Sequence, residues 1–537
     1  MFPSCILDAV RDDRRWQPRL AGVLAAAAAL GVSRLLDSLS ESAPSLVAVV
    51  GQAFIRIAPP TLERFAVGSV GTADKPILVV TTVVLSLMIG ARVGRAAVAR
   101  PRIGDLAFAG FAGLTVVAAA WVGHVSVAGT AASAGIAALV GALVLRRLIG
   151  SRDGVVAAAP VVDGASDPAP PAPGPYEGPG ASGLSRRRFL TEGSLVAGGT
   201  ALTLAGAWGL RRPGVTSQQR AAVRLPAPAE PVPVPADGLG LSTRGISPLV
   251  TPNRDFFRID EALVVPSVDL TTWRLRLTGM LDRPYEVSFD ELLAMPLVER
   301  HVTLSCVSNE VGGPLVGTAR WLGVRLSDLL ERAGVQPGAD QLVGRSVDGF
   351  TAGFPVEAAT DGRDALVAVG MNGEALPRRH GFPARLVVPG LYGYVSATKW
   401  LREIHLTTFD AFDAYWVERN WARRAPVKVQ SRIDVPRDYA NVTAGRLVVA
   451  GVAWAPNRGI EQVELSVDKG EWSPAHLGPS LADDAWRQWT WEWDAQPGNH
   501  VVDVRATTRD GEVQTANRKG SFPDGATGHH QCHLRVR

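Results

Sequence analysis

The sequence predicts a chain of three parts: a helical membrane module, an α+β domain and a C-terminal β-sandwich of the immunoglobulin-like type. Three observations support this prediction. Four apolar runs in the first 150 residues are each roughly 20 residues long, the length that crosses a hydrocarbon core. From residue 246 the apolar residues fall in short β-type runs broken by Gly and Pro, with few amphipathic helices. From residue 441 only β runs and turn signals remain.

The composition excludes two broad classes of protein. The 537 residues contain 55 Lys and Arg against 51 Asp and Glu, and a net charge of +4 is too small to indicate a nucleic-acid-binding surface. Three cysteines, Cys5, Cys306 and Cys532, are too few for a disulfide framework in a chain of this length.

Residues 1–150 are predicted to form a four-span membrane module that serves as an anchor or docks a partner. A haem-binding bundle would need paired histidines, and His124 is the only histidine in this region. Three arginine clusters fall on one side of the membrane if each run crosses once, so the positive-inside rule predicts a cytoplasmic start. A shorter run at 45–59 is expected at the membrane interface. The spans themselves are expected at residues 20–39, 76–94, 104–123 and 125–145.

Residues 151–245 join this module to the soluble part. Residues 151–184 are rich in Pro, Gly and Ala, which indicates a linker. Residues 185–211 begin with Ser-Arg-Arg-Arg-Phe-Leu and continue with an apolar stretch, which predicts a twin-arginine-like signal retained as a fifth span. An ordinary fifth span with a basic flank is the alternative, and both place the following residues across the membrane. Residues 212–245 are predicted to form a Pro-rich spacer.

Residues 246–440 are predicted to form the α+β domain, with mostly antiparallel or mixed sheet. Amphipathic helices are expected at residues 289–294 and 326–333. The β-type runs are residues 273–277, 301–304, 342–347, 365–369 and 385–388.

Cys306 is the first candidate functional residue, because it ends a predicted strand and enters a loop of small residues. A buried, inert cysteine is one alternative. A nucleophile is another, with His301, His380 or His405 as its base. The sequence contains no C-x-x-C or H-E-x-x-H motif, which argues against zinc. A lone thiolate suits a metal whose other ligands come from an organic cofactor.

A second cluster surrounds the predicted strand at 385–388. His380, Arg385 and Lys399 are cations that suit a phosphate group, and Gly390 would let the backbone approach a ligand. A solvated rim of cations is the alternative.

Together the two clusters and their neighbours resemble the sulfite oxidase family of molybdopterin enzymes over residues 246–537. The matching motifs follow the order of the family. They are T-P-N-x-x-F-F at 251–257, T-L-x-C-x-x-N at 303–309, W-x-G-x-x-L-x-D-L-L at 321–330, M-N-G-x-x-L-P at 371–377, H-G-F-P-x-R-L-V-V-P-G at 380–390 and K-W-L at 399–401.

The resemblance implies an oxidoreductase that transfers an oxygen atom at a molybdenum–molybdopterin cofactor. It implies that Cys306 ligates molybdenum and that Asn253 and Arg258 line the metal pocket. It also implies that the pterin and its phosphate are held by His380, Arg385 and Lys399, with Asp348 as a further contact. Cofactor insertion in the cytoplasm would explain an export signal for folded proteins.

One departure bears on the substrate. Sulfite oxidases and nitrate reductases place an arginine just after the asparagine of the cysteine loop, where this chain has Glu310 and Val311. A carboxylate there would repel an oxyanion, so a sulfoxide or an N-oxide is expected as readily as an oxyanion. A sulfite dehydrogenase is the enzymatic alternative. A cofactor-less, membrane-tethered binding or scaffold protein is the alternative from another class.

Residues 441–537 are predicted to form an immunoglobulin-like domain, which in the family often mediates dimers. His529, His530, Cys532 and His533 alternate between the two faces of a strand, so they are not expected to form a metal site. The chain has no haem-binding domain, and electrons are expected to pass to or from a separate haem protein or quinone-linked partner. The expected location is the plasma membrane, with several spans and an extracytoplasmic catalytic domain.

Overall fold

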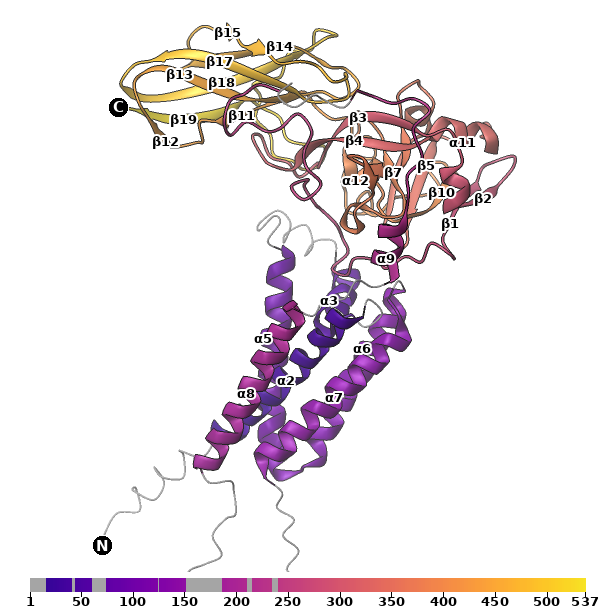
Figure 1. The fold of residues 1–537 in the computed structure, drawn as a ribbon, viewed down its shortest axis with the longest axis vertical. Helices are drawn as coiled ribbons and strands as arrows, with labels where there is room; N and C mark the ends of the chain where they lie inside the picture. The colour runs from indigo at the N-terminus through magenta and orange to yellow at the C-terminus, as the bar shows by residue number, and fades with distance from the viewer. Residues whose placement is uncertain are drawn as a thin grey trace, which may run out of the picture. The chain divides into compact units, whose positions relative to one another are not determined.

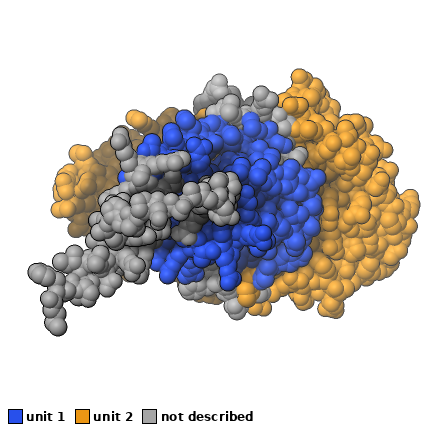
Figure 2. All heavy atoms as spheres, turned by 90° about the horizontal axis from the view of Figure 1, so that it is seen from below, with its two compact units in different colours: residues 1–57, 73–214 blue, residues 58–72, 215–537 orange. Residues whose placement is uncertain are grey.

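A computed structural model describes residues 16–40, 44–59, 74–123, 125–150, 186–209, 215–233 and 240–537. The chain divides into two compact units, coloured separately in Figure 2. Unit 1 comprises residues 1–57 and 73–214, and unit 2 comprises residues 58–72 and 215–537. The predicted linker at 151–184, His124, Ser185 and most of the first arginine cluster lie outside the described residues.

Unit 1 consists of helices in the described part of the chain (Figure 1). Four of them are long and apolar enough to cross a membrane, which is compatible with a multi-pass membrane protein. They are α2 (Trp16–Leu39), α5 (Asp74–Ala99), α6 (Arg102–Val122) and α7 (Val127–Ile149). The predicted interfacial run forms a shorter apolar helix, α3 (Leu46–Ile57). The predicted fifth span forms α8 (Arg186–Gly209), which is not one of these four.

Small residues bring α2 and α5 together. A methyl group on Gly22 would overlap the carbonyl oxygen of Gly90, and one on Gly94 would overlap that of Pro18. Gly90 and Gly94 form a G-x-x-x-G pair, which lets two helix backbones approach closely inside a membrane. Between α6 and α7, Arg146 forms a bidentate pair with Asp105, with N···O distances of 2.9 and 2.5 Å.

The first part of unit 2 contains two five-stranded sheets. One has the strand order β2-β1-β10-β5-β6, in which β1 and β10 are parallel and the other pairs are antiparallel. These strands are β1 (Arg274–Gly279), β2 (Tyr285–Ser288), β5 (Gln341–Ser346), β6 (Thr351–Pro355) and β10 (Leu401–Thr407).

The other sheet has the order β3-β4-β7-β8, with β9 also paired to β7. Its strands are β3 (Val298–Ser305), β4 (Val316–Arg325), β7 (Leu366–Met371), β8 (Glu374–Ala375) and β9 (Arg385–Val387). The five predicted β runs of this domain therefore correspond to strands in the two sheets.

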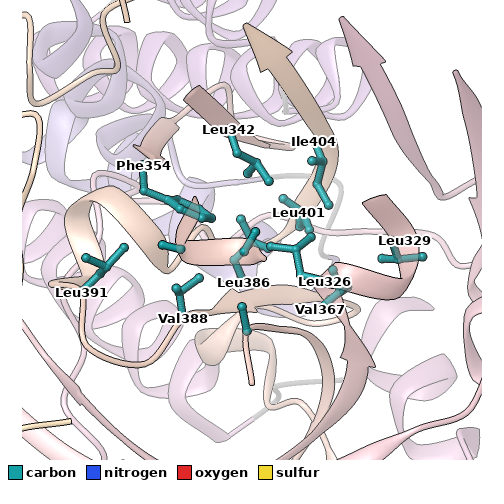
Figure 3. Close-up of a cluster of buried hydrophobic side chains, with 14 of the residues drawn as sticks. Leu326, Leu329, Leu342, Phe354, Val367, Leu386, Val388, Leu391, Leu401 and Ile404 are labelled. Atoms are coloured by element: carbon teal, nitrogen blue, oxygen red, sulfur yellow. The ribbon is translucent and has the colours of Figure 1, made fainter. Parts of the chain in front are cut away.

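The predicted helices form α10 (Phe289–Leu293) and α11 (Leu326–Ala333), and α12 (Gly393–Ser396) is a further short helix. Ser288 and Glu291 cap α10 reciprocally, and this arrangement satisfies backbone amides at its start. The leucines of α11 pack into the main core, in which side chains from β5, β6, β7, β9 and β10 meet (Figure 3). This core supports the strand ends that carry the candidate site.

The C-terminal part of unit 2 also contains two sheets, with orders β11-β13-β17-β16 and β12-β19-β18-β14-β15. Side chains from both sheets share one core, and Trp489 is fully buried in it. The strands are β11 (Gln430–Val435), β12 (Ala440–Val442), β13 (Gly445–Trp454), β14 (Ile460–Val467), β15 (Ser473–Pro474), β16 (His476–Leu477), β17 (Arg487–Ala495), β18 (Gly498–Thr508) and β19 (His530–Val536).

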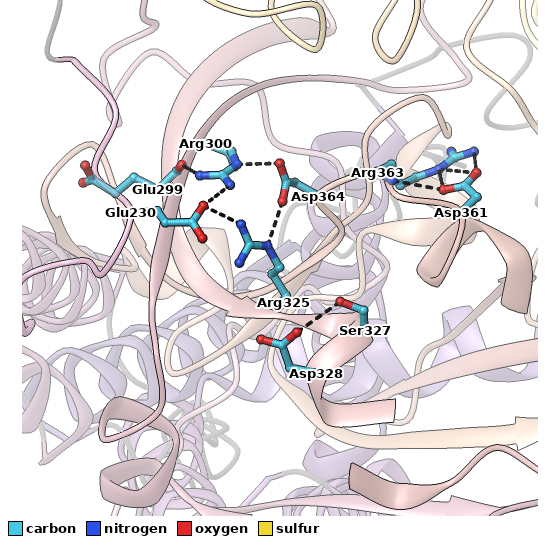
Figure 4. A network of polar contacts seen from close by, with 9 residues as sticks. All are labelled: Glu230, Glu299, Arg300, Arg325, Ser327, Asp328, Asp361, Arg363 and Asp364. Atoms are coloured by element: carbon cyan, nitrogen blue, oxygen red, sulfur yellow. Dashed lines mark hydrogen bonds and ion pairs between the residues drawn. The ribbon is translucent and has the colours of Figure 1, made fainter. Parts of the chain in front are cut away.

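The described part of the predicted spacer is fastened to unit 2. After α9 (Val215–Ala222), the amide of Ala229 donates to Leu297 and that of Glu299 donates to Glu230, so the segment lies along β3. The Glu230 carboxylate pairs with Arg300 at 2.6 Å and with Arg325 at 2.5 Å. Both arginines also pair with Asp364, and the four side chains form a closed ring (Figure 4).

Candidate functional site

A cavity opens where the two sheets of the first part of unit 2 meet. The space between its walls is about 780 Å³, a volume that includes the solvent at its mouth. The aromatic side chains in its wall are Phe256, Phe257, Phe350, Tyr394, Trp400 and Trp416. The polar side chains with titratable groups are Asp260, Glu261, Cys306, Asp348, His380, Arg385 and Lys399.

Cys306 lies in the cavity wall directly after β3, as its position at a predicted strand end suggested. Its amide donates to Leu315 at 2.9 Å, and its carbonyl accepts from the Asn309 amide at 3.1 Å. The Asn309 side chain in turn accepts from the Leu315 amide at 2.8 Å, so the loop is closed on itself. Burial raises the pKa of the Cys306 thiol, against hydrogen bonds from Ser308. A bound metal cation would reverse this effect, because a coordinating thiol loses its proton.

Arg385 is a buried cation at the start of β9. Among the residues that the structure describes, no carboxylate lies within ion-pair distance of it. Its guanidinium donates to the His380 carbonyl at 3.2 Å and lies 4.9 Å from the centre of the Trp321 ring. Burial lowers the pKa of Arg385 to about 9. An anionic ligand in the cavity would supply the missing counter-charge.

His380 is held in its neutral form. Its Nε2 donates to the backbone carbonyl of Asn253 at 2.9 Å, and its ring packs edge-to-face on Phe256. Burial, followed by the nearby charge of Arg385, lowers the pKa of His380 to about 4. The imidazole therefore acts near neutral pH as a fixed hydrogen-bonding group rather than as a cation.

Lys399 and Arg258 share one carboxylate. The Asp260 side chain, which is 1% exposed, pairs with the Lys399 ammonium and with Nε of Arg258. The Lys399 ammonium also donates to the Ile259 carbonyl at 2.9 Å. Asp260 and Lys399 line the cavity, whereas Arg258 is not among the residues in its wall.

The remaining predicted site residues occupy different places. Asp348 lines the cavity, and its carboxylate accepts from the Phe350 amide at 3.1 Å. The Asn253 amide group is outside the wall and donates to Glu374 at 2.6 Å. Gly390 is also outside the wall. With a φ of +80°, it makes room for Asn457 of the C-terminal part, whose Cβ would lie 3.0 Å from an added methyl group. A close approach thus requires this glycine, but the neighbour is protein rather than ligand.

One expectation about charge needs correction. Glu310 is exposed and does not line the cavity, so the carboxylates of the wall come from other residues. The acidic groups in the wall are Asp260, Glu261 and Asp348, of which the sequence singled out only Asp348. Asp260 and Glu261 lie shortly after the T-P-N-x-x-F-F motif, and that position was the available signal. Their burial depends on how this segment packs, which the sequence does not contain.

Apart from His380, the histidines considered as bases or metal ligands lie outside the cavity wall. His301 and His405 do not line the cavity, although His301 is buried in β3. In the described part of the chain, no group of three or more His, Cys, Asp or Glu side chains is arranged to hold a metal ion. His529 hydrogen-bonds to the Gln514 carbonyl, His530 accepts from the Ile433 amide, and His533 pairs with Asp438.

Residues 262–416 match the family model described as "Oxidoreductase molybdopterin binding domain". A sulfite oxidase from Arabidopsis thaliana is 30% identical over 274 residues, which cover 42% of this chain and 69% of that protein. The chain belongs to the sulfite oxidase family of molybdopterin-dependent oxidoreductases. The predicted family, enzyme class and molybdenum–molybdopterin cofactor are therefore confirmed.

Other members of the sulfite oxidase family show the extent of the similarity. Human mitochondrial sulfite oxidase is 33% identical over 303 residues, which cover 48% of this chain and 55% of the relative. The chain thus spans about half the length of that relative. Among solved structures, the sulfane dehydrogenase SoxCD from Paracoccus pantotrophus has a TM-score of 0.48 at 24% identity, covering 55% of this chain and 82% of that chain.

The side chains of the cavity fit the cofactor of the sulfite oxidase family. The Cys306 thiol is a soft donor of the kind that binds such metals. Arg385 offers a buried guanidinium to an anionic group such as a phosphate, and no described carboxylate competes for it. Both groups face the same cavity.

Proposed function

We propose that this chain is a membrane-anchored molybdenum oxidoreductase that transfers an oxygen atom to or from a small, uncharged substrate such as a sulfoxide or an N-oxide. One observation carries the proposal. The Cys306 thiol, the buried Arg385 guanidinium and the neutral His380 imidazole line a single cavity.

Each of these side chains has a role in the proposed site. Cys306 ligates molybdenum, and its closed loop fixes the sulfur in the cavity wall. Arg385 neutralises the anionic part of the cofactor, His380 and Lys399 contact it, and Asp348 accepts hydrogen bonds from the pterin. When bound, the cofactor supplies the oxygen-atom and two-electron chemistry.

The other three predicted residues act indirectly. Asn253 positions His380 through its backbone carbonyl, which keeps a proton on Nε2 of the imidazole. Arg258 is paired with Asp260 and acts on the cavity through that carboxylate. Gly390 contributes by letting the loop after β9 pack against Asn457.

The charges in the cavity wall support an uncharged substrate. Lys399 is already paired with Asp260, and Arg385 is assigned to the cofactor. An oxyanion would thus meet carboxylates without an available guanidinium or ammonium group in the described wall. A sulfite dehydrogenase is the second candidate, favoured by the sulfite oxidases among the relatives.

The rest of the chain suggests the setting of this reaction. We assign residues 1–150 to a four-span anchor in the plasma membrane and 185–211 to a twin-arginine-like fifth span, which places the catalytic domain on the extracytoplasmic side. We also assign 246–440 to the catalytic domain and 441–537 to an immunoglobulin-like domain suited to homodimer formation. The two-sheet arrangement of the C-terminal part supports the immunoglobulin-like assignment. Electrons pass to or from a separate haem protein or quinone-linked partner.

The decisive experiment is the molybdenum and pterin content of the detergent-extracted protein, made in a host that synthesises the cofactor. About one of each per chain, followed by reduction of a sulfoxide or N-oxide with an artificial donor, is the expected result. Folded protein with neither would instead support a cofactor-less binding or scaffold protein. Turnover of sulfite without turnover of sulfoxides or N-oxides would support the sulfite dehydrogenase.

A further inference from the structure

One exposed aromatic side chain of unit 2 is connected to the wall of the cavity through a single buried tryptophan. Phe522 is 51% exposed, and it is the only exposed phenylalanine among the described residues of unit 2. Its ring packs edge-to-face on the buried Trp421, with 5.2 Å between the ring centres. Trp421 in turn contacts the rings of Tyr394 at 5.8 Å and Trp416 at 6.1 Å. Because Tyr394 and Trp416 line the cavity together with Cys306, two ring contacts separate its wall from the protein surface.

Hydrogen bonds hold these rings in contact. The amide of Ala422 donates to the Pro523 carbonyl at 3.1 Å, and the Ala422 carbonyl accepts from the Tyr394 hydroxyl at 2.6 Å. Ala422 and Pro523 directly follow Trp421 and Phe522 in the chain. The same backbone contacts therefore fix the exposed ring against the buried one and the buried one against the cavity wall.

The two segments that meet here carry excess positive charge. Residues 421–428 and 518–527 contain five Lys and Arg residues but only one carboxylate, that of Asp524. Among the described residues, Arg424, Arg518 and Lys519 are exposed and form no ion pair. We call these three cations together with Phe522 the Phe522 surface.

An apolar centre with a charged rim is typical of protein interfaces, and electron-transfer partners use small interfaces of this kind. Opposite charges on the two proteins steer the encounter and set its rate more than its strength. A partner with an acidic face suits the positive charge of the Phe522 surface, whereas an uncharged membrane quinone would gain nothing from it.

We propose that the Phe522 surface docks the electron-transfer partner of the enzyme, a small haem protein with an acidic face. The inference rests on the proposed function, which assigns the electrons to a separate partner. It deepens that function, because a haem protein docked on Phe522 is two ring contacts from the wall that contains Cys306.

The stoichiometry of the reaction sets what this partner delivers. Reduction of a sulfoxide consumes two electrons and two protons, and it releases the sulfide and one water molecule. A haem protein gives up one electron as its iron is oxidised from the ferrous to the ferric state. Two reduced partner molecules therefore dock in turn for each turnover, which requires rapid exchange at the surface. An encounter steered by charge provides this.

The test measures electron donation to the full-length, cofactor-loaded protein in detergent, with dimethyl sulfoxide or trimethylamine N-oxide as substrate. The donor is a reduced, low-potential c-type cytochrome with an acidic surface, and its oxidation is followed by haem absorbance. Reduced methyl viologen, a small donor that needs no docking surface, measures the catalytic reaction separately. The variants are F522S and R424E. Their matched controls are Y439S, at another exposed aromatic residue, and R535E, at an exposed arginine of β19.

F522S and R424E are each expected to lower kcat/KM for the acidic cytochrome about tenfold, because each removes part of the docking surface. Their rates with methyl viologen are expected to equal that of the wild type, and Y439S and R535E are expected to match the wild type with both donors. Added salt is expected to lower kcat/KM for the cytochrome in the wild type, and to lower it less in R424E. If F522S does not fold, the exposed position of R424E keeps the test available.

Three results would overturn the inference. One is an unchanged kcat/KM for the cytochrome in the folded variants. Another is an equal loss of rate with both donors, which would place the effect in the cavity rather than at a docking surface. The third is a wild-type enzyme that methyl viologen reduces and the acidic cytochrome does not. Failure of the proposed function is recognised separately, because the wild type would then turn over neither substrate with methyl viologen.

Discussion

Replacing Arg385 by methionine is expected to stabilise the cofactor-free protein. Burial lowers the pKa of Arg385 by more than three units from its ordinary value, to about 9. At about 1.4 kcal/mol per pH unit, keeping this charge in the folded protein costs about 5 kcal/mol. Methionine has a similar length and no charge, so it removes this penalty. It also removes a hydrogen bond to the His380 carbonyl and the contact with the Trp321 ring.

The balance of these effects predicts that the free energy of unfolding rises by about 1–4 kcal/mol. This is the range found when buried ion pairs are replaced by apolar side chains. The pH dependence of this gain follows from the direction of the pKa shift. Because the folded pKa is lower than the unfolded one, the penalty is present in full below pH 9 and disappears as pH rises toward the ordinary pKa of arginine. The difference between the two proteins is therefore largest at neutral pH.

The assay is thermal unfolding in detergent at pH 7, followed by tryptophan fluorescence, with protein from a host that cannot synthesise molybdopterin. Cofactor-free R385M is expected to melt a few degrees above the wild type. In a cofactor-competent host the same variant is expected to retain far less pterin, because the anion loses its counter-charge. Arg379→Met, at an exposed position in the same segment, is the control.

A cofactor-free R385M protein that melts below the wild type would refute the reasoning. It would mean that the contacts of Arg385 with Trp321 and His380 outweigh its desolvation. Equal pterin retention by the two proteins would separately contradict the assignment of Arg385 to the cofactor.

Three further predictions concern the metal ligand, the membrane helices and the segment before the catalytic domain. Cys306→Ser is expected to leave the protein folded but to abolish molybdenum retention and turnover. Cys532→Ser, at the other described cysteine, is expected to keep the metal. Metal analysis of both variants checks this prediction, and a fully active C306S enzyme would contradict it. Gly90→Leu is expected to separate α2 from α5 and to lower the melting temperature in detergent. Gly110→Leu is expected to be tolerated, because an added methyl group there meets no atom within 4 Å. Equal melting temperatures of the two variants would count against the close crossing of α2 and α5. Hydrogen bonds from Arg325 and Arg300 lower the pKa of Glu230 to about 2. The contribution of Glu230 to the stability of the folded protein is therefore expected in full above pH 4.5 and is lost as pH falls toward 2. Limited proteolysis within residues 223–233 should therefore be faster in E230Q than in the wild type at pH 7, and the two rates should converge in acid.

The elements of the fold followed closely from local sequence patterns. The run at 326–333 forms α11 with the predicted bounds, because its apolar spacing matches the period of a helix. The four apolar runs of the first 150 residues likewise correspond to the four long apolar helices. These features depend on residues close together in the chain, so no tertiary information was required.

The tertiary structure was needed wherever distant segments meet. Residues 215–233 have the composition of a spacer, yet Glu230 is fixed by arginines on β3 and β4. Gly390 has the appearance of a ligand-binding glycine, yet its neighbour is Asn457. Glu310 stands at the family's arginine position, yet it is exposed, whereas Asp260 and Asp348 are buried in the wall.

The sequence by itself determined the family, the cofactor and the candidate side chains, including Cys306, His380 and Arg385. These properties depend on which residue types occur in which order, and short motifs record that order. Only the tertiary structure decided which charged groups form ion pairs and which side chains line the cavity. Burial and ion pairing depend on contacts between segments far apart in the chain, such as that between Asp260 and Lys399.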